Sequence, residues 1–210
     1  MIDWKNTKLR DFFVHYDAAN LNHQAAVDLL QKHAAHLMND NAEWVRVFRG
    51  IVADTTYLQI AASIIKEFEG LRAAPYKCPA GIWTIGYGTT YYPDGEIVQA
   101  SDNQISKERA TELLEYHIDH AVVPVLESSI PTWGIMSENQ KAAIISFAYN
   151  LGSHFYGNKD FKTITKALST KENLKDVPSA MLLYVNPGSI FEVGLRRRRR
   201  AEGKLWTKAT

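Results

Sequence analysis

The sequence predicts a mostly helical α+β protein with two lobes, a small antiparallel sheet and a helical extension at its N-terminus. Apolar residues recur at helical spacing up to Glu69 and again from Ser106 onward, whereas residues 82–87 alternate with a period of two. We interpret residues 74–100 as a small antiparallel sheet of two or three strands. A helix, then a small sheet, then many helices is an order typical of α+β proteins. We therefore expect a sheet lobe at about residues 70–105 and a helical lobe at about residues 106–207.

Residues 1–53 predict a small helical unit ahead of a main domain of residues 54–210. An apolar stripe runs along residues 23–37, and a second short apolar pattern follows at residues 44–48. A unit of about 50 residues is marginal for independent folding, so we expect it to pack on the main domain. The alternative is a small binding module.

The stretch from Glu69 to Gly88 changes structural period twice and carries a polar group at each change. The helical spacing of apolar residues stops at Phe68, so Glu69 and Gly70 fall where a helix ends. Further on, the period becomes two in a strand rich in β-branched and aromatic residues. The hydroxyl of Thr84 on this strand can point back toward the carboxylate of Glu69.

Turn and capping signals mark the elements that follow. Pro93-Asp94-Gly95 combines a preset φ with a glycine that accepts positive φ, which predicts a turn. Ser106 predicts the N-cap of a helix that Pro124 ends or kinks. Ser137 and Gln140 form a capping-box signature for the next helix. Three more helices are expected at residues 161–169, 177–185 and 192–206.

The composition is that of an ordinary soluble globular protein, with 46% hydrophobic and 22% charged residues. A single cysteine, Cys78, rules out an internal disulfide framework and any zinc site built from several cysteines. His33 and His36 lack a third ligand at metal spacing, so we expect them to be exposed helix histidines. His117 and His120 repeat the spacing, and we expect no metal there and no other cofactor. The sequence has no apolar signal-peptide core and no run of ~18 apolar residues. We therefore expect neither a signal peptide nor a transmembrane segment.

The spacing of three polar residues resembles that of a known family. Glu69 is followed by eight residues and Cys78, and Cys78 by five residues and Thr84. Three more blocks match in order: Trp83-Thr84-Ile85-Gly86-Tyr87-Gly88, Ala148-Tyr149-Asn150-Leu151-Gly152, and Gly194-Leu195-Arg196-Arg197-Arg198 with Ala201-Glu202. Over roughly residues 56–207 the chain resembles the phage-type lysozymes, or endolysins, of glycoside hydrolase family 24. This resemblance implies a lysozyme-like fold and a muramidase that cleaves the β-1,4 bond between N-acetylmuramic acid and N-acetylglucosamine during lysis by a phage or prophage.

Glu69 is the expected general acid. Glycoside hydrolysis needs an acid that protonates the leaving oxygen, and desolvation in an apolar cleft favours the neutral carboxyl group. The resemblance implies that Thr84 helps to place the attacking water, and Asp94 and Glu96 are fallback carboxylates. The implied substrate-binding residues are Arg72, Tyr76, Tyr87 and Asn150.

Cys78 stands where the family commonly has an aspartate that orients water or stabilises charge on the far side of the sugar. A thiol of ordinary pKa, ~8.5, is mostly neutral at pH 7 and stabilises positive charge poorly. A thiolate could act as a base or as a nucleophile, and the alternative is a packed apolar cysteine. Inversion and retention therefore both stay open. Thr89 also departs from the family, which usually has a histidine there, and we interpret this as the loss of a structural partner.

Charge is unevenly distributed along the chain, although the net charge is only +1. Residues 161–210 hold 11 Lys and Arg against 4 Asp and Glu, a net +7, whereas residues 1–160 hold 13 against 19, a net −6. A basic C-terminal part favours an anionic partner such as nucleic acid, a membrane surface or an acidic cell-wall polymer. The alternative is a solvated helix face.

Five consecutive arginines exceed the family pattern: Arg196, Arg197, Arg198, Arg199 and Arg200. On a helix they point around more than one turn, so some face inward and others face solvent. We expect the inward arginines to form buried ion pairs or to touch substrate. The outward ones, with Lys204 and Lys208, are candidates for contact with anionic lipopolysaccharide or phospholipid.

The resemblance implies a monomer that acts on peptidoglycan and binds no nucleic acid. The protein is expected to wait in the host cytoplasm until a holin opens the inner membrane, and then to reach the periplasm and cell wall. The alternatives are a lytic transglycosylase, a lysozyme-like effector, or a catalytically inactive peptidoglycan-binding protein that uses residues 1–53 for targeting.

Overall fold

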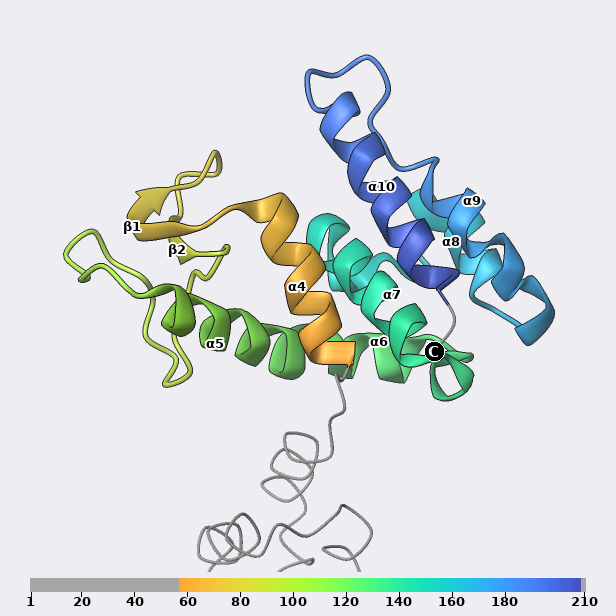
Figure 1. Cartoon of the computed structure of the whole chain (residues 1–210), viewed down its shortest axis with the longest axis horizontal. Coiled ribbons are helices and arrows are strands. Elements are labelled where there is room, and N and C mark those ends of the chain that lie inside the picture. Colours follow the sequence, from red (N-terminus) through yellow and green to blue (C-terminus); the bar gives the residue numbers. More distant parts are fainter. Residues whose placement is uncertain (1–56, 209–210) are drawn as a thin grey trace, which may run out of the picture. The chain divides into compact units, whose positions relative to one another are not determined.

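Helix α4 (Tyr57–Glu69) opens the described part of the chain, which is residues 57–208 of a computed structural model (Figure 1). Its buried residues Ala61, Ala62 and Ile65 follow the helical spacing of the sequence. Gly70 has φ 70°, a conformation that glycine adopts without strain, so the chain turns immediately after Glu69. The predictions for residues 1–53, including His33 and His36, lie outside the described residues.

Two antiparallel strands form the sheet of the small lobe: β1 (Arg72–Lys77) and β2 (Trp83–Gly86). Tyr76 pairs with Thr84 and Arg72 with Gly86, and the register shifts between these pairs. Pro75 lies within the shift and has no N–H to donate to the ladder. The predicted turn forms as well, because the N–H of Gly95 donates to the carbonyl of Tyr92 at 2.9 Å.

The segment after the sheet is helical from Lys107 to Ser129 but changes its winding in the middle. Helix α5 (Lys107–His117) begins at the predicted N-cap Ser106, whose side chain accepts from the N–H of Arg109. A π turn, η2 (Ile118–Val122), then leads into α6 (Val123–Ser129), with Pro124 in the first turn of α6. Proline is tolerated there because a first-turn N–H needs no helical partner, so the segment continues past Pro124.

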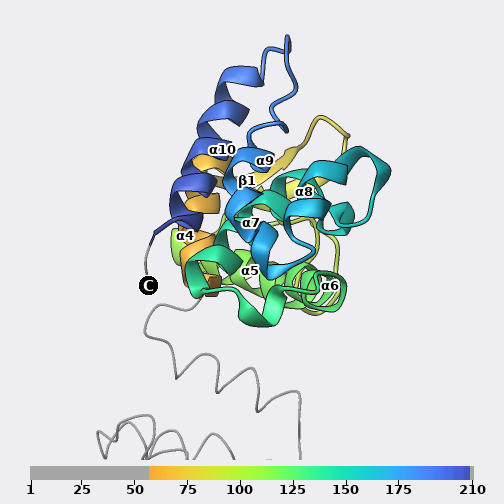
Figure 2. The ribbon, with the colours of Figure 1, turned by 90° about the vertical axis from the view of Figure 1, so that its right-hand side faces the viewer.

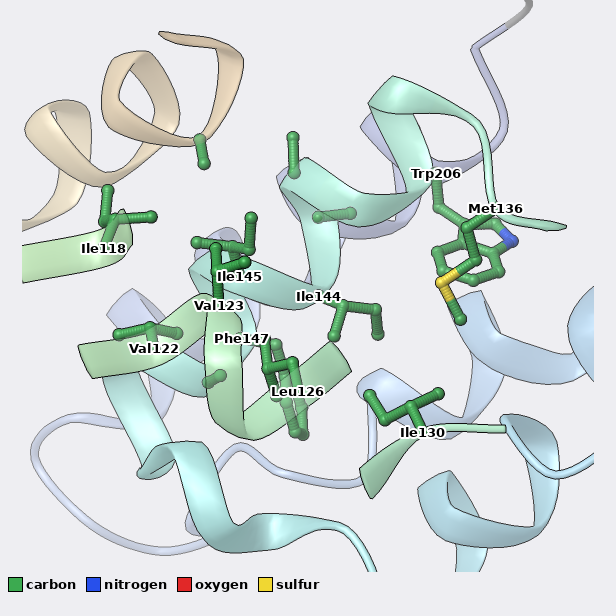
Figure 3. Packing of buried hydrophobic residues seen from close by; sticks show 14 of the residues in the cluster. Ile118, Val122, Val123, Leu126, Ile130, Met136, Ile144, Ile145, Phe147 and Trp206 are labelled. Atoms are coloured by element: carbon green, nitrogen blue, oxygen red, sulfur yellow. The ribbon is translucent and has the colours of Figure 1, made fainter. Parts of the chain in front are cut away.

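Helix α7 (Glu138–Leu151) lies at the centre of the helical lobe. Its capping box forms as predicted, with Ser137 and Gln140 each accepting from the backbone N–H of the other. The buried side chain of Phe147 packs edge-to-face on Phe155 and Tyr184. Helix α7 packs against both α4 and the last helix (Figures 1 and 2), and Figure 3 shows its side chains meeting those of α6 in the core.

The rest of the lobe consists of short helical turns and one long helix. The turns are η3 (Trp133–Ile135), η4 (Ser153–Phe155), η5 (Lys159–Phe161), α8 (Lys162–Ala167), η6 (Lys171–Asp176) and α9 (Val177–Met181). Helix α10 (Glu192–Trp206) matches the predicted bounds, whereas α9 ends earlier than expected. The described residues thus form the predicted α+β fold, and none of their helices is long and apolar enough to cross a membrane.

Candidate active site

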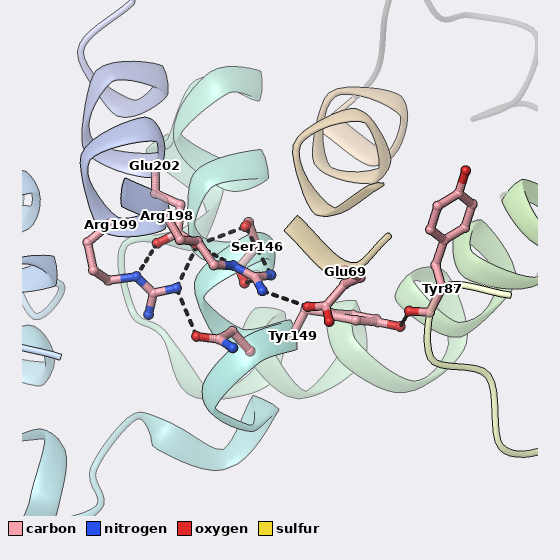
Figure 4. A network of polar contacts seen from close by, with 8 residues as sticks. Glu69, Tyr87, Ser146, Tyr149, Arg198, Arg199 and Glu202 are labelled. Atoms are coloured by element: carbon pink, nitrogen blue, oxygen red, sulfur yellow. Dashed lines mark hydrogen bonds and ion pairs between the residues drawn. The ribbon is translucent and has the colours of Figure 1, made fainter. Parts of the chain in front are cut away.

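Glu69 is the last residue of α4, and its carboxylate lies beside α10. Its Oε1 accepts a hydrogen bond from Nη1 of Arg198 at 2.6 Å (Figure 4). The Glu69 side chain is 30% exposed and that of Arg198 only 4%, so a buried cation holds a carboxylate that solvent can reach. Glu69, expected to face an apolar cleft, therefore also has a buried cation beside it.

Arg198 uses its other donors inside the helical lobe. Its Nε donates to Oε1 of Glu202 at 3.3 Å, and its Nη2 donates to the carbonyl of Ser146 at 3.1 Å. The hydroxyl of Ser146 in turn donates to the same Glu202 oxygen at 2.8 Å. Helices α4, α7 and α10 therefore meet in one polar network around the Arg198 guanidinium.

Arg199 completes this network from the other side of α10. Its Nη2 donates to Oε1 of Glu202 at 2.9 Å and to Oδ1 of Asn150 at 3.1 Å. Its Nε lies 2.8 Å from Oε2 of Glu202, but that contact lacks hydrogen-bond geometry and is an ion pair only. Burial lowers the pKa of Arg199 to about 10 and raises the pKa of Glu202, while each partner charge opposes the shift.

The five arginines divide as the helix geometry predicts. Arg198 and Arg199 are buried and form ion pairs, which confirms the inward part of the prediction and removes these two from any surface offered to an anionic partner. Arg196 pairs with Glu192 at 2.7 Å, and Arg197 pairs with Glu67 at 2.7 Å. Arg200 is exposed, and the structure gives it no ion pair within residues 57–208.

Cys78 and Thr84 meet at the end of the sheet. The backbone N–H of Cys78 donates to the carbonyl of Ile82 at 2.9 Å, and the buried hydroxyl of Thr84 donates to the same carbonyl at 3.1 Å. The pKa of the Cys78 thiol is lowered, first by the backbone N–H of Ile82 and then by Ala80 and the Thr84 hydroxyl. This thiol is partly exposed and favours the thiolate more than an ordinary cysteine does.

Tyr76 lies on the sheet and is close enough to Glu69 for the charge of Glu69 to act on its phenol. Burial raises the pKa of its phenol, Arg72 opposes the rise, and the negative charges of Cys78 and Glu69 add to it. The guanidinium of Arg72 lies 5.0 Å from the centre of the Tyr76 ring. The structure therefore brings Arg72, Tyr76, Cys78 and Glu69 into one electrostatic neighbourhood.

Tyr149 is a site residue that the motif spacing did not single out. Its hydroxyl donates to the backbone carbonyl of Tyr87 at 2.8 Å, and its pKa is raised by burial and by the charge of Glu69. The Tyr87 side chain, expected to contact substrate, is only 4% exposed and points away from Glu69 (Figure 4). Tyr87 therefore serves the site through its carbonyl group rather than through its ring. Asn150, also expected to bind substrate, has its side-chain oxygen occupied by a hydrogen bond from Arg199.

The remaining candidates lie apart from this network. Asp94 is exposed and accepts from the N–H of Glu96 within the turn, and the structure shows no bond from either residue to the site in the described part of the chain. His117 contacts the hydroxyl of Tyr91, whereas His120 contacts the backbone carbonyl of Tyr116, so the two rings do not converge.

The chain is similar to phage lysins in both sequence and structure. Residues 66–202 match the phage lysozyme family. The endolysin of Acyrthosiphon pisum secondary endosymbiont phage 1 is 31% identical over 154 residues, which cover 70% of this chain and 94% of that protein. The endolysin from Escherichia coli O157:H7 phage FAHEc1 superposes with a TM-score of 0.59 at 26% identity, over 75% of this chain and 97% of that one. The muramidase domain of SpmX from Asticaccaulis excentricus superposes with a TM-score of 0.56 at 25% identity, over 71% and 95%. The chain belongs to the phage lysozyme family.

Proposed function

We propose that the protein is a peptidoglycan hydrolase of the muramidase type, which cleaves the β-1,4 bond between N-acetylmuramic acid and N-acetylglucosamine during host lysis by a phage or prophage. The observation that carries the proposal is the placement of Glu69, which ends α4 with a solvent-accessible carboxylate held by buried Arg198. Family membership and relatives named as endolysins support it.

In this mechanism Glu69 is the general acid. Its proton passes to the glycosidic oxygen, and the bond from that oxygen to C1 of N-acetylmuramic acid breaks. The carboxylate that remains is stabilised by the charge-assisted hydrogen bond from Arg198. Arg198 therefore favours the product of the proton transfer.

Cys78 acts on the far side of the sugar, and its role decides between two stereochemical outcomes. As a thiolate, favoured by its backbone N–H contacts and by Thr84, it stabilises the positive charge that develops on the sugar. If it orients a water molecule with Thr84, that water attacks C1 and the configuration inverts. If the sulfur itself attacks C1, a second displacement by water restores the configuration.

A lytic transglycosylase is the second candidate function. The observation that favours it is the site itself, which brings one carboxylate, Glu69, next to the sheet and leaves Asp94 and Glu96 in an exposed turn. With a single acid, the 6-hydroxyl of N-acetylmuramic acid can take the place of water and give a 1,6-anhydro product. A catalytically inactive peptidoglycan-binding protein is the third candidate.

One digestion separates the three. Purified peptidoglycan is treated with the full chain, with Glu69→Gln, with Cys78→Ala and with Glu67→Gln, and the soluble products are analysed by mass spectrometry. Reducing ends identify hydrolysis, anhydro ends identify transglycosylation, and no soluble product from the wild type rejects enzyme status. Glu67→Gln is the matched control, because Glu67 lies two positions away and pairs with exposed Arg197. Full activity in Glu69→Gln would remove the proposed acid.

The proposal includes the partners and location of such a lysin. The protein acts as a monomer without a cofactor and without nucleic acid, and it stays in the host cytoplasm until a holin opens the route to the cell wall. Lysis of cells that express the chain with and without a holin, compared at equal expression, tests this route. Lysis without the holin would exclude it.

The outer face of α10 is the proposed contact for an anionic surface. Exposed Arg200 and Lys204 lie one turn apart on this face, and exposed Lys208 follows the helix. Next to its N-terminal end, Ile190 and Phe191 are 91% and 64% exposed. Basic residues combined with exposed apolar residues on one segment are typical of surfaces that bind anionic lipid.

A further inference from the structure

We propose that Glu202 is a positioning residue for Glu69, that it acts through the guanidinium of Arg198, and that Ser146 holds Glu202 in this role. The inference rests on the proposed function, in which Glu69 supplies the proton.

The first support is the geometry of the Arg198 guanidinium. Its Nε is held by Glu202 at 3.3 Å, and its Nη2 is held by the carbonyl of Ser146 at 3.1 Å. A guanidinium is planar, so fixing two of its nitrogens also fixes the direction of the third. That third nitrogen, Nη1, is the one that meets Glu69 at 2.6 Å (Figure 4).

The second support is the position of Ser146 on the neighbouring helix. Its hydroxyl donates to Glu202 at 2.8 Å, on the oxygen that also accepts from Arg198 and Arg199. The Glu202 carboxylate is therefore held from α7 and from its own helix α10. Both Ser146 and Glu202 are fully buried, so the contact is made away from solvent and away from substrate.

The third support is the balance of charge. Arg198 and Arg199 are both buried and share one buried carboxylate, that of Glu202, so Glu69 provides the second negative charge. Loss of the Glu202 charge would leave the two buried cations to act on Glu69 without the carboxylate that offsets them. Such a field favours ionised Glu69 and makes the proton donor scarcer at a given pH.

The other groups that face Glu69 keep their charge in the pH range in which a carboxyl group titrates. Tyr149 on α7 and Tyr76 on β1 both have a raised pKa, chiefly because of burial. Arg72, which contacts the Tyr76 ring, stays cationic. The Cys78 thiol near Tyr76 titrates at higher pH than a carboxyl group does. The network of Arg198, Arg199 and Glu202 is thus the part of this environment that a substitution at Glu202 alters.

The test compares Glu202→Gln and Ser146→Ala in the full chain. The titration of the Glu69 carboxyl carbon is followed by ¹³C NMR, and its signal is assigned by its loss in Glu69→Gln. We expect its midpoint to fall by about one pH unit in Glu202→Gln, the size of effect of removing one charge on the far side of the Arg198 guanidinium at an effective dielectric of ~20. Ser146→Ala is expected to shift it in the same direction by less. The alkaline limb of the plot of kcat/KM against pH is expected to move to lower pH by the same amount as the Glu69 midpoint. KM on the acid side of the plot should stay unchanged.

Thr132→Val is the matched control. Thr132 is a buried hydroxyl in the same lobe that donates to the carbonyl of Leu168 at 2.7 Å, away from the network. Its loss lowers thermal stability without a shift of the Glu69 midpoint. This variant separates a loss of stability from a loss of positioning.

The outcomes are distinct from those of the proposed function. An unchanged or higher midpoint in a folded Glu202→Gln would overturn the positioning role. If Glu202→Gln does not fold, an unchanged midpoint in Ser146→Ala overturns it instead. The NMR titration needs no turnover, so a wild type that releases nothing from peptidoglycan would refute the proposed function and leave this measurement intact.

Discussion

Nη1 of Arg198 lies 2.6 Å from Oε1 of Glu69, although 129 positions separate the two residues in the chain. The pair joins the first described helix to the last one, so the surroundings of the proposed acid are completed only when α10 has packed on the lobe. Arg198 is therefore both a core residue and a site residue.

Removing Arg198 is expected to cost much more stability than removing a neighbouring arginine. Arg198→Ala leaves Glu202 fully buried with one arginine fewer, and breaking such a buried pair costs about 3–5 kcal/mol. The control Arg196→Ala removes a partly exposed pair with Glu192, which is worth about 0–1 kcal/mol. Urea unfolding of both variants measures the difference. Equal losses would contradict the structural role of Arg198.

Gly88→Ala is expected to destabilise the protein and to disturb Tyr149. A Cβ at position 88 would lie 2.8 Å from the Tyr149 hydroxyl, and φ is 117°. Strain of this kind costs on the order of 1–3 kcal/mol. Gly134→Ala, where the new Cβ would meet nothing within 4 Å, is the control and should change stability by less than about 0.5 kcal/mol. Similar melting temperatures for the two variants would refute the close approach.

Cys78 is expected to react with iodoacetamide at lower pH than an ordinary thiol. Its pKa is lowered, so the alkylation rate rises with pH around a midpoint below that of an ordinary cysteine. Thr84→Val removes one of the contributing hydrogen bonds and moves the midpoint upward. A midpoint at or above that of a cysteine in a short unstructured peptide would show that the thiolate is not stabilised.

His117 is expected to make the protein less stable on mild acidification. Burial lowers its pKa from 6.5, so just below that pH the unfolded chain binds more protons than the folded one. Stability is therefore complete above about pH 6.5 and falls as the pH falls through the folded pKa. His117→Gln should flatten this fall in melting temperature, whereas His120→Gln, an exposed ring on the same segment, should not. If the melting temperatures of wild type and His117→Gln fall in parallel as the pH is lowered, the predicted role of His117 is wrong.

The outer face of α10 is expected to bind anionic vesicles in a salt-sensitive way. At about 1 kcal/mol for each basic residue, Arg200→Gln with Lys204→Gln should weaken binding to phosphatidylglycerol vesicles roughly 30-fold. Lys171→Gln with Lys175→Gln makes the same change of charge at exposed positions of η6 and should have less effect. Binding that does not weaken with added salt would sink the proposal.

Much of the fold could be predicted because its signals are local. The caps at Ser106 and Ser137, the turn at Gly95 and the bounds of α10 each depend on residues within a few positions of one another. The end of α9 and the path through Pro124 were predicted less well. Both depend on packing or on a π turn that periodicity does not reveal.

The site also has a part that the sequence predicted and a part that depends on tertiary packing. Motif spacing singled out Glu69, Cys78 and Thr84, and the structure brings Cys78 and Thr84 to the same carbonyl, that of Ile82. The motif spacing did not indicate that the Tyr87 ring would point away from Glu69, or that the Tyr149 hydroxyl would donate to the Tyr87 carbonyl. A ring and a carbonyl of one residue can face opposite ways, and only the packed strand decides which of them reaches the site.

The sequence by itself determined the element types, the family and the identity of the proposed acid, because these follow from short-range periodicity and from residue types at fixed spacing. It also indicated that some of the five arginines would face inward. Only the tertiary structure decided that Arg198 meets Glu69 while Arg199 meets Asn150 and both share Glu202. The physical reason is that a buried charge takes whichever opposite charge the packing of distant helices brings within reach, and no local pattern specifies that choice.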